Sequence, residues 1–201
     1  MAAATASPLA VTTPPEPRRP RVLYFGAAFA AASSALVVIS MLAVYLQRRA
    51  ENLAGGETAL PEDVVLPLTP GNMGALTLLM SAVTLAWAIY SLRNDDRPHA
   101  YMAIGLTLVF GAAFIVDTAY LYQQLLLSPT SDPMAGLLYA VTGAHLVMTV
   151  VAMLFVAVMG FQALGGQLTG RDAEGMSAAA IYWYVMIAAY GAVWYGVYIT
   201  K

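Results

Sequence analysis

The sequence contains no cysteine and carries little charge. Without cysteine the 201-residue chain can form no disulfide, no thiolate metal site and no haem attachment through C-x-x-C-H. Only 10% of its residues are charged, against about 25% in a typical soluble domain. The net charge of −2 gives no reason to expect nucleic acid as a partner. Of all its residues 60% are hydrophobic, which is typical of a membrane protein.

Catalytic motifs are missing as well. The chain has no Gly-x-Ser-x-Gly elbow, no His-Glu-x-x-His, no phosphate-binding loop and no Gly-x-Gly-x-x-Gly. Its two histidines, His99 and His145, cannot supply paired haem ligands within the membrane, because His99 falls in a predicted loop. A metal site would need three or four convergent ligands. We therefore predict no catalytic residue, no metal ligand and no cofactor-binding residue in this chain.

Five long apolar segments dominate the sequence. A hydrocarbon core of about 30 Å requires about 20 apolar residues in a helix, and five segments meet that length. Because lipid offers the backbone no hydrogen bonds, each segment must be helical. The sequence predicts an all-α integral membrane protein, a bundle of five transmembrane helices. The predicted spans are Val22–Leu46, Met73–Leu92, Ala100–Leu126, Gly136–Phe161 and Ala178–Ile199.

The segment before the first span, residues 1–21, is rich in Ala, Thr and Pro. We expect a disordered tail, with no cleavable signal peptide, before a membrane domain over residues 22–201. The distribution of basic residues predicts the orientation. Six would lie on the side of the N-terminus and three on the other, which predicts a cytoplasmic N-terminus and an external C-terminus. The first group is Arg18, Arg19, Arg21, Arg93, Arg97 and Arg171, and the second is Arg48, Arg49 and Lys201.

The predicted connections differ in length. The longest runs from Gln47 to Asn72, and Asn72 is a candidate cap for the second helix. The short connections Arg93–His99 and Ser128–Pro133 predict antiparallel hairpins, and the fourth connection, Gly165–Ser177, is rich in glycine and polar residues. There is no internal repeat, which argues against the repeat-built transporter folds.

Small and aromatic residues leave two interpretations open. Small residues fill much of the first span and part of the third, where they allow close helix packing, either within the bundle or against another subunit. Aromatic residues near the ends of the fifth span are most simply an interfacial belt, whereas Tyr190 lies mid-span and needs a partner for its hydroxyl. The candidates for lipid or subunit contacts are Trp87, Tyr120, Tyr182 and Trp183.

Asp117 and His145 are the only ionisable side chains, apart from tyrosine, well inside the predicted spans. Each lies about nine residues from the external end of its helix, roughly 13 Å deep. We predict that they face each other, directly or through water, because an intramembrane charge normally has a partner in the bundle interior. A polar clasp that fixes helix register is the simplest interpretation, and a proton-related role is the alternative.

Several strings resemble subunit III of the haem-copper oxidases, in a short bacterial form with five helices. The resemblance covers residues from about Ser33 to Lys201 and rests on the order and spacing of the strings. They are Ser33-Ser34-Ala35, Ala43-Val44-Tyr45 and Arg48-Arg49-Ala50; Asn72, Leu78–Thr84 and Trp87-Ala88; Gly111–Phe114 and Ala119–Tyr122; Tyr139 with Thr142–His145; and Tyr182-Trp183.

The chain also departs from the family pattern. Two positions where the family places an intramembrane Glu are Ala35 and Leu121 here. The second His of the fourth-helix motif is Met148, and the fifth-helix His and Asp are Tyr184 and Ile187. The chain therefore resembles a diverged member that has lost most of the polar interior.

Asp117 lies one helical turn before Leu121, on the same face. Our hypothesis is that Asp117 replaces the missing Glu as the partner of His145.

The resemblance implies an accessory subunit with no haem or copper of its own. It would pack against catalytic subunit I and other oxidase subunits in a hetero-oligomer of the bacterial cytoplasmic (inner) membrane. The haem and copper would belong to those partners, and a phospholipid is a candidate ligand of this chain. The implied role is to stabilise the core and to sustain proton uptake during aerobic electron transport.

Other functions stay open at this point. Within the family, the alternatives are an accessory protein of nitric oxide reductase clusters and a quinol-oxidising version of the complex. From another class, a small channel or transporter could use Asp117 and His145 as a relay. A membrane enzyme is disfavoured by the missing catalytic motifs.

Overall fold

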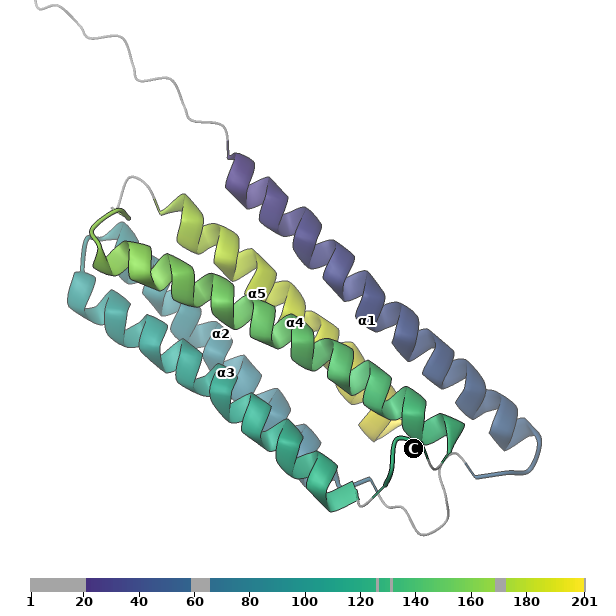
Figure 1. Cartoon of the computed structure of the whole chain (residues 1–201). Coiled ribbons are helices and arrows are strands. Elements are labelled where there is room, and N and C mark those ends of the chain that lie inside the picture. Colours follow the sequence, from purple (N-terminus) through teal and green to yellow (C-terminus); the bar gives the residue numbers. More distant parts are fainter. Residues whose placement is uncertain (1–20, 59–65, 126, 131, 169–172, 201) are drawn as a thin grey trace, which may run out of the picture.

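The computed structural model describes residues 21–58, 66–125, 127–130, 132–168 and 173–200. The predictions made for residues 1–20 lie outside these ranges. The described residues form five α-helices, the last of which continues into a π-helix, and they contain no strand (Figure 1). The elements are α1 (Val22–Ala54), α2 (Leu68–Arg93), α3 (Arg97–Leu125), α4 (Pro133–Leu164), α5 (Glu174–Val193) and η1 (Trp194–Ile199).

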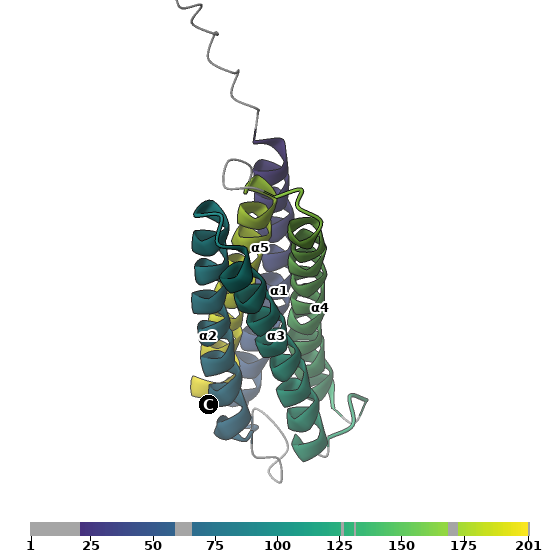
Figure 2. The same ribbon diagram turned by 90° about the vertical axis from the view of Figure 1, so that its left-hand side faces the viewer.

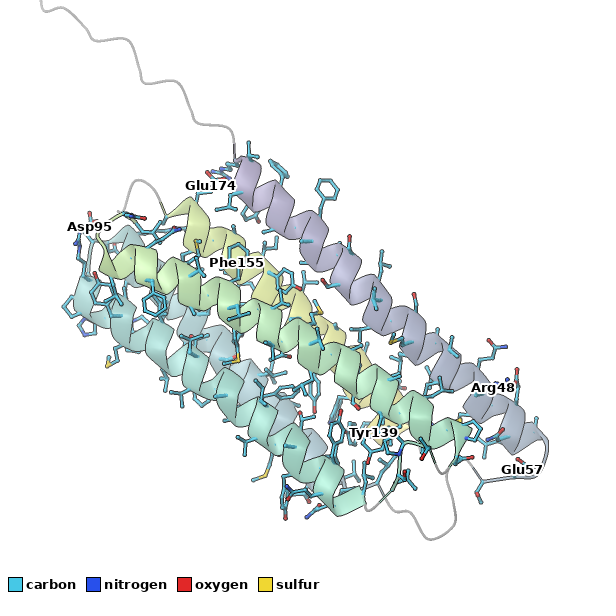
Figure 3. All side chains as sticks on the ribbon, in the orientation of Figure 1. Arg48, Glu57, Asp95, Tyr139, Phe155 and Glu174 are labelled. Carbon is cyan, nitrogen blue, oxygen red and sulfur yellow. The ribbon has the colours of Figure 1, made fainter. Side chains whose placement is uncertain are left out.

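The predicted class of fold is confirmed. All five helices are long and apolar enough to cross a membrane, at 26 to 33 residues when η1 is counted with α5. At 1.5 Å per residue even 26 residues extend about 39 Å, which exceeds the hydrocarbon core of about 30 Å. The helices alternate in direction, so α1 begins at the end of the bundle opposite the C-terminus (Figure 1). Figure 3 shows Asp95 and Glu174 at one end of the bundle and Arg48 and Glu57 at the other.

The helix ends differ from the predicted spans. Helix α1 continues to Ala54 instead of ending at Leu46, and α2 begins at Leu68 instead of Met73. The prediction from hydropathy follows only the apolar stretch, whereas a helix can continue into water with its polar residues. The long connection is shortened accordingly at both ends.

Asn72 is not the cap of α2, contrary to the prediction. It lies inside the helix, and the residue at the N-cap position is Pro67, which makes no side-chain capping bond. The Asn72 amide oxygen instead accepts a hydrogen bond from Trp194 Nε1, at 2.9 Å. Its polar side chain therefore joins α2 to the start of the π-helix.

Helix α5 is the centre of the bundle. It packs against α1, α2 and α4, while α3 closes the other side through α2 and α4. Figures 1 and 2 agree that α1 lies on one side of the α4–α5 pair and that α3 lies on the other. More than half of the most apolar stretch of α5 is buried within the chain, against about a fifth of that in α1.

Polar contacts join α1 to α5 along its whole length. Each end of α1 and its middle supply one such contact, so the register between the two helices is fixed at three levels. The contacts are Tyr24 N to Glu174 Oε1 at 3.4 Å, Ser34 Oγ with Tyr182 Oη at 2.9 Å, and Arg49 Nη1 to Thr200 Oγ1 at 2.8 Å.

Both predicted hairpins are confirmed, and the second has a side-chain cap. Asp132 precedes Pro133, the first residue of α4, and its carboxylate accepts a hydrogen bond from Met134 N at 3.0 Å. Proline suits this first position because it has no N–H to satisfy, and Asp is a preferred N-cap. These two residues explain why α4 starts three residues before the predicted span.

We expect Asp132→Ala to lower the free energy of unfolding by about 1 kcal/mol, because the capping acceptor is lost. Asp132→Asn is the matched control, since its amide oxygen can still accept from Met134 N. The measurement is the midpoint of thermal unfolding in detergent, followed by circular dichroism. Equal midpoints for the alanine and asparagine variants would contradict a capping role.

Candidate functional site

A small cavity with several polar side chains in its wall lies between four helices, in the half of the bundle that contains the C-terminal end. Its volume is about 10 Å³, close to the least that a single water molecule needs. Residues of α2, α3, α4, α5 and η1 line it, so every helix except α1 contributes. The polar residues of its wall are Asp117, Thr118, Thr142, His145, Tyr190 and Tyr198.

The structure brings Asp117 and His145 to this one cavity, from α3 and α4. Asp117 lies about 12 Å from the end of α3 and His145 about 18 Å from the start of α4, counted at helical rise. Among the described residues no hydrogen bond joins the two side chains. A direct pair is therefore not what the structure shows, and contact through water stays a prediction.

His145 is almost completely buried, with 1% of its surface exposed. Its Nε2 is 3.1 Å from the backbone oxygen of Met186 in α5. Because a carbonyl only accepts, Nε2 must carry the proton and donate it, which leaves Nδ1 as an acceptor. The ring also lies edge-on to Phe114, with 5.5 Å between the ring centroids. The imidazole is thus held as the Nε2–H tautomer by α5.

The carboxylate of Asp117 lies close to α2. A methyl group added to Gly74 would lie 3.0 Å from Asp117 Oδ2 and 2.8 Å from the Tyr190 hydroxyl oxygen. The missing side chain of Gly74 therefore allows a carboxylate from α3 and a hydroxyl from α5 to reach the backbone of α2. Our hypothesis that Asp117 replaces the missing Glu as the partner of His145 therefore stays a prediction, with water as the link between the two side chains.

Tyr190 has the hydrogen-bond partner that its mid-span position required. Its hydroxyl donates to the backbone oxygen of Gly71, in the first turn of α2, at 3.0 Å. The ring of Tyr190 also contacts Phe114 edge-on, at 4.9 Å between centroids, and lies 5.1 Å from the ring of His145. Tyr190 therefore joins α5 to α2 beside the cavity.

Tyr198 also lines the cavity, although its place near the end of the fifth predicted span favours the interfacial belt. It is 3% exposed, and its ring is so close to Gly71 that an added methyl group would lie 2.9 Å from Cδ1. Tyr198 belongs to η1, in which Thr200 N donates to Tyr195 O at 3.1 Å, a spacing of five residues. No local sequence signal marks this wider turn, so the inward direction of Tyr198 could not be predicted.

Two of the four candidates for lipid or subunit contact are core residues instead. Tyr182 is 4% exposed and Trp183 is fully buried. Trp183 Nε1 donates to Ser81 Oγ at 2.9 Å, so it joins α5 to α2, as the Tyr182–Ser34 contact joins α5 to α1. Both side chains point inward because α5 is the central helix. Hydropathy does not reveal that central position.

The other two candidates lie at the surface of the chain. Tyr120 is exposed on α3, and its hydroxyl oxygen accepts a hydrogen bond from Gln124. Trp87 is half-buried on α2, and its ring lies 6.0 Å from the imidazole of His99. Contacts of these two side chains with lipid or with a partner stay predictions.

His99 forms a pair with Asp96 where α3 begins. The Asp96 carboxylate accepts from His99 Nδ1 at 2.7 Å, and this hydrogen bond lowers the pKa of Asp96 below its usual value. The second histidine of the chain is therefore engaged at the end of the bundle opposite the cavity. Within the described ranges, no three His, Cys, Asp or Glu side chains gather as a metal site would require.

Five apolar helices with a few satisfied polar groups between them define a multi-pass helical membrane protein. The sequence model of the family described as cytochrome c oxidase subunit III matches residues 22–201. The chain therefore belongs to the cytochrome c oxidase subunit III family, as its resemblance implied.

Individual relatives are similar to parts of the chain. It is 30% identical over 114 residues to the probable cytochrome c oxidase subunit 3 of Rickettsia conorii, which covers 56% of this chain and 40% of that protein. It is 28% identical over 127 residues to cytochrome c oxidase subunit 3 of Pelomedusa subrufa, with coverage of 62% and 49%. For the Sus scrofa protein the identity is 27% over 143 residues, with coverage of 70% and 53%. The matches thus span about half the length of these relatives.

We expect Gly74→Ala to destabilise the bundle, because the new methyl group meets the Asp117 carboxylate and the Tyr190 hydroxyl. Overpacking costs about 1–3 kcal/mol, which exceeds the gain of about 1 kcal/mol in helix propensity. Gly105→Ala is the matched control, because nothing lies within 4 Å of its added methyl group. Thermal unfolding in detergent should rank Gly74→Ala below the wild type and Gly105→Ala at or above it; the reverse order would contradict this packing.

Proposed function

We propose that the chain is a non-catalytic accessory subunit of a respiratory haem-copper oxidase. It packs against the catalytic subunit, stabilises that subunit and sustains its proton uptake during turnover. The haem and copper belong to the partner subunits. The complex is a hetero-oligomer of the bacterial cytoplasmic membrane, with the N-terminus of this chain in the cytoplasm. The family match over residues 22–201 is the observation that carries the proposal.

The environment of the two histidines supports redox centres in other subunits. His145 uses Nε2 to donate to the Met186 carbonyl, deep in the bundle. His99 uses Nδ1 in its contact with Asp96, where α3 begins. Because the chain has no further histidine and no cysteine, neither ring has a second strong ligand of these types to complete a haem or copper site.

The outer surface of the helices supports a partner within the membrane. Large apolar side chains are more than half exposed on four of the five helices. Such a surface suits lipid tails, or the apolar face of another membrane subunit that packs closely against it. Examples are Phe29 on α1, Leu76 on α2, Val116 on α3, and Leu154 and Phe161 on α4.

A channel or transporter is not favoured by the cavity. Its volume of about 10 Å³ suits one water molecule, which is a single step of a proton path and not a route across the membrane. Accessory roles in a quinol oxidase or beside a nitric oxide reductase involve the same kind of surface. They are distinguished by the partner that the chain binds.

Purification of the tagged chain from its native membrane, in mild detergent, tests the proposal. We expect haem-bearing subunits to co-purify and to give a reduced-minus-oxidised haem spectrum, with oxygen consumption driven by reduced cytochrome c or by quinol. Consumption of nitric oxide instead would identify the reductase alternative. A colourless homo-oligomer that conducts protons in vesicles would overturn the proposal.

Removal of the chain from the complex tests the supporting role. We expect an oxidase that lacks this subunit to begin turnover at a rate near that of the whole complex and then to lose activity sooner. The measurement is oxygen consumption over many turnovers, with the purified wild-type chain added back as the control. An unchanged lifetime of activity without the chain would contradict this role.

A further inference from the structure

Three polar groups at the cavity have hydrogen-bonding capacity that no other described residue uses. They are the carboxyl group of Asp117, Nδ1 of His145 and the hydroxyl group of Tyr198. His145 is 1% exposed and Tyr198 is 3% exposed, so bulk water or lipid headgroups do not surround them. All three belong to the wall of the same cavity, although they come from α3, α4 and η1.

The unused atoms of His145 and Tyr198 must border open space. In the described part of the chain, every fully buried polar atom of a side chain that is not exposed has a hydrogen-bond partner. Nδ1 of His145 and the hydroxyl oxygen of Tyr198 have none, so these two atoms are not fully enclosed by protein atoms. The cavity that both residues line supplies this open space.

We propose that the cavity binds one water molecule, which bridges Asp117 and His145. The water donates one hydrogen bond to His145 Nδ1 and one to the Asp117 carboxylate, and it accepts one from the Tyr198 hydroxyl. These three bonds match the usual number for a buried water, and the cavity of about 10 Å³ is close to the size of one.

The chemistry of the wall favours water over a metal cation. His145 presents a bare imidazole nitrogen, because its proton is on the Nε2 that faces Met186 O. Na⁺, Mg²⁺ and Ca²⁺ prefer several oxygen ligands, and Asp117 is the only carboxylate in the wall. Transition metals would need two or three further nitrogen or sulfur ligands. Water needs only the donors and acceptors already in place.

The π-helix contributes to this site by its wider turn. Tyr198 follows Tyr190 by eight residues, which in a regular α-helix would rotate its side chain about 80° away from the direction of Tyr190. A π turn rotates less per residue, so η1 brings Tyr198 back to the face on which Tyr190 lies, and both residues line the cavity. Single π turns are frequent at functional sites. All the residues that would hold the water belong to this chain, so the site does not depend on an oxidase partner.

The two histidines of the chain make the test direct. We would label the full chain with ¹⁵N-histidine in lipid bilayers, and record magnetisation transfer from water to the imidazole rings by solid-state NMR. His99→Gln assigns the two signals. We expect His145 to show a protonated Nε2, a bare Nδ1 and transfer from a bound water. A His145 ring that receives no transfer, while the ring of His99 does, would overturn the proposal.

Cavity variants supply the matched controls. Val193→Leu adds one carbon to a buried wall residue, so we expect it to abolish water transfer to His145 and to leave the His99 signal unchanged. Asp117→Asn keeps an acceptor and should retain the transfer, whereas Asp117→Leu should lose it. Transfer that is equal in all three variants would overturn the bridging site, as would a His145 Nδ1 signal that shifts with Na⁺ concentration.

Tyr198→Phe tests the third hydrogen bond if the leucine variants do not fold. We expect weaker transfer from water to His145 in this variant. Unchanged transfer would overturn the part of Tyr198 in the site.

Discussion

A polar group inside a lipid bilayer needs a partner within the protein or in an enclosed water molecule, and this constraint organises the bundle. The contacts that satisfy it also join the helices. Trp183 Nε1 reaches Ser81 between α5 and α2, and the hydroxyl groups of Thr84 and Thr107 meet at 2.8 Å between α2 and α3. Since lipid tails are as apolar as leucine, such bonds and close packing replace the hydrophobic effect as the force that selects neighbours. The described residues accordingly leave no fully enclosed polar side-chain atom without a partner.

Close packing and polar contact depend on each other at the start of α2. Gly71 and Gly74 have no side chains, so Tyr198, Tyr190 and Asp117 can approach the helix backbone. The Gly71 carbonyl then becomes the acceptor for Tyr190, which would otherwise be an unsatisfied hydroxyl group in the membrane. Glycine is therefore explained at Gly71 by the Tyr198 ring opposite it and at Gly74 by the polar groups of Tyr190 and Asp117, and not by a need for backbone flexibility.

The sequence predicts the number and order of the helices well because hydropathy marks each apolar stretch, but it predicts the helix ends and the side-chain directions less well. The meeting of Asp117 and His145 at one cavity followed from their similar depth on antiparallel helices, a geometric argument that needs no detail of packing. The inward direction of Tyr182 and Trp183 depends on the central place of α5, and an aromatic residue near a helix end fits a belt equally well. Tyr198 was beyond such reasoning, because the π turn that directs it inward has no sequence signature.

At most of the positions where the resemblance expects polar residues, this chain has apolar ones, yet a few polar residues stay in its interior. Leu121, where the resemblance expects a Glu, lines the same cavity as Asp117, one turn away on α3. Met148, where it expects a second His, is buried in the apolar core. The wall of this cavity holds a single carboxyl group, that of Asp117, which lies beside Gly74 and the Tyr190 hydroxyl and has no direct hydrogen bond to His145. Asp117 stands one turn before Leu121 on α3, where its carboxyl group lies beside Gly74 of α2.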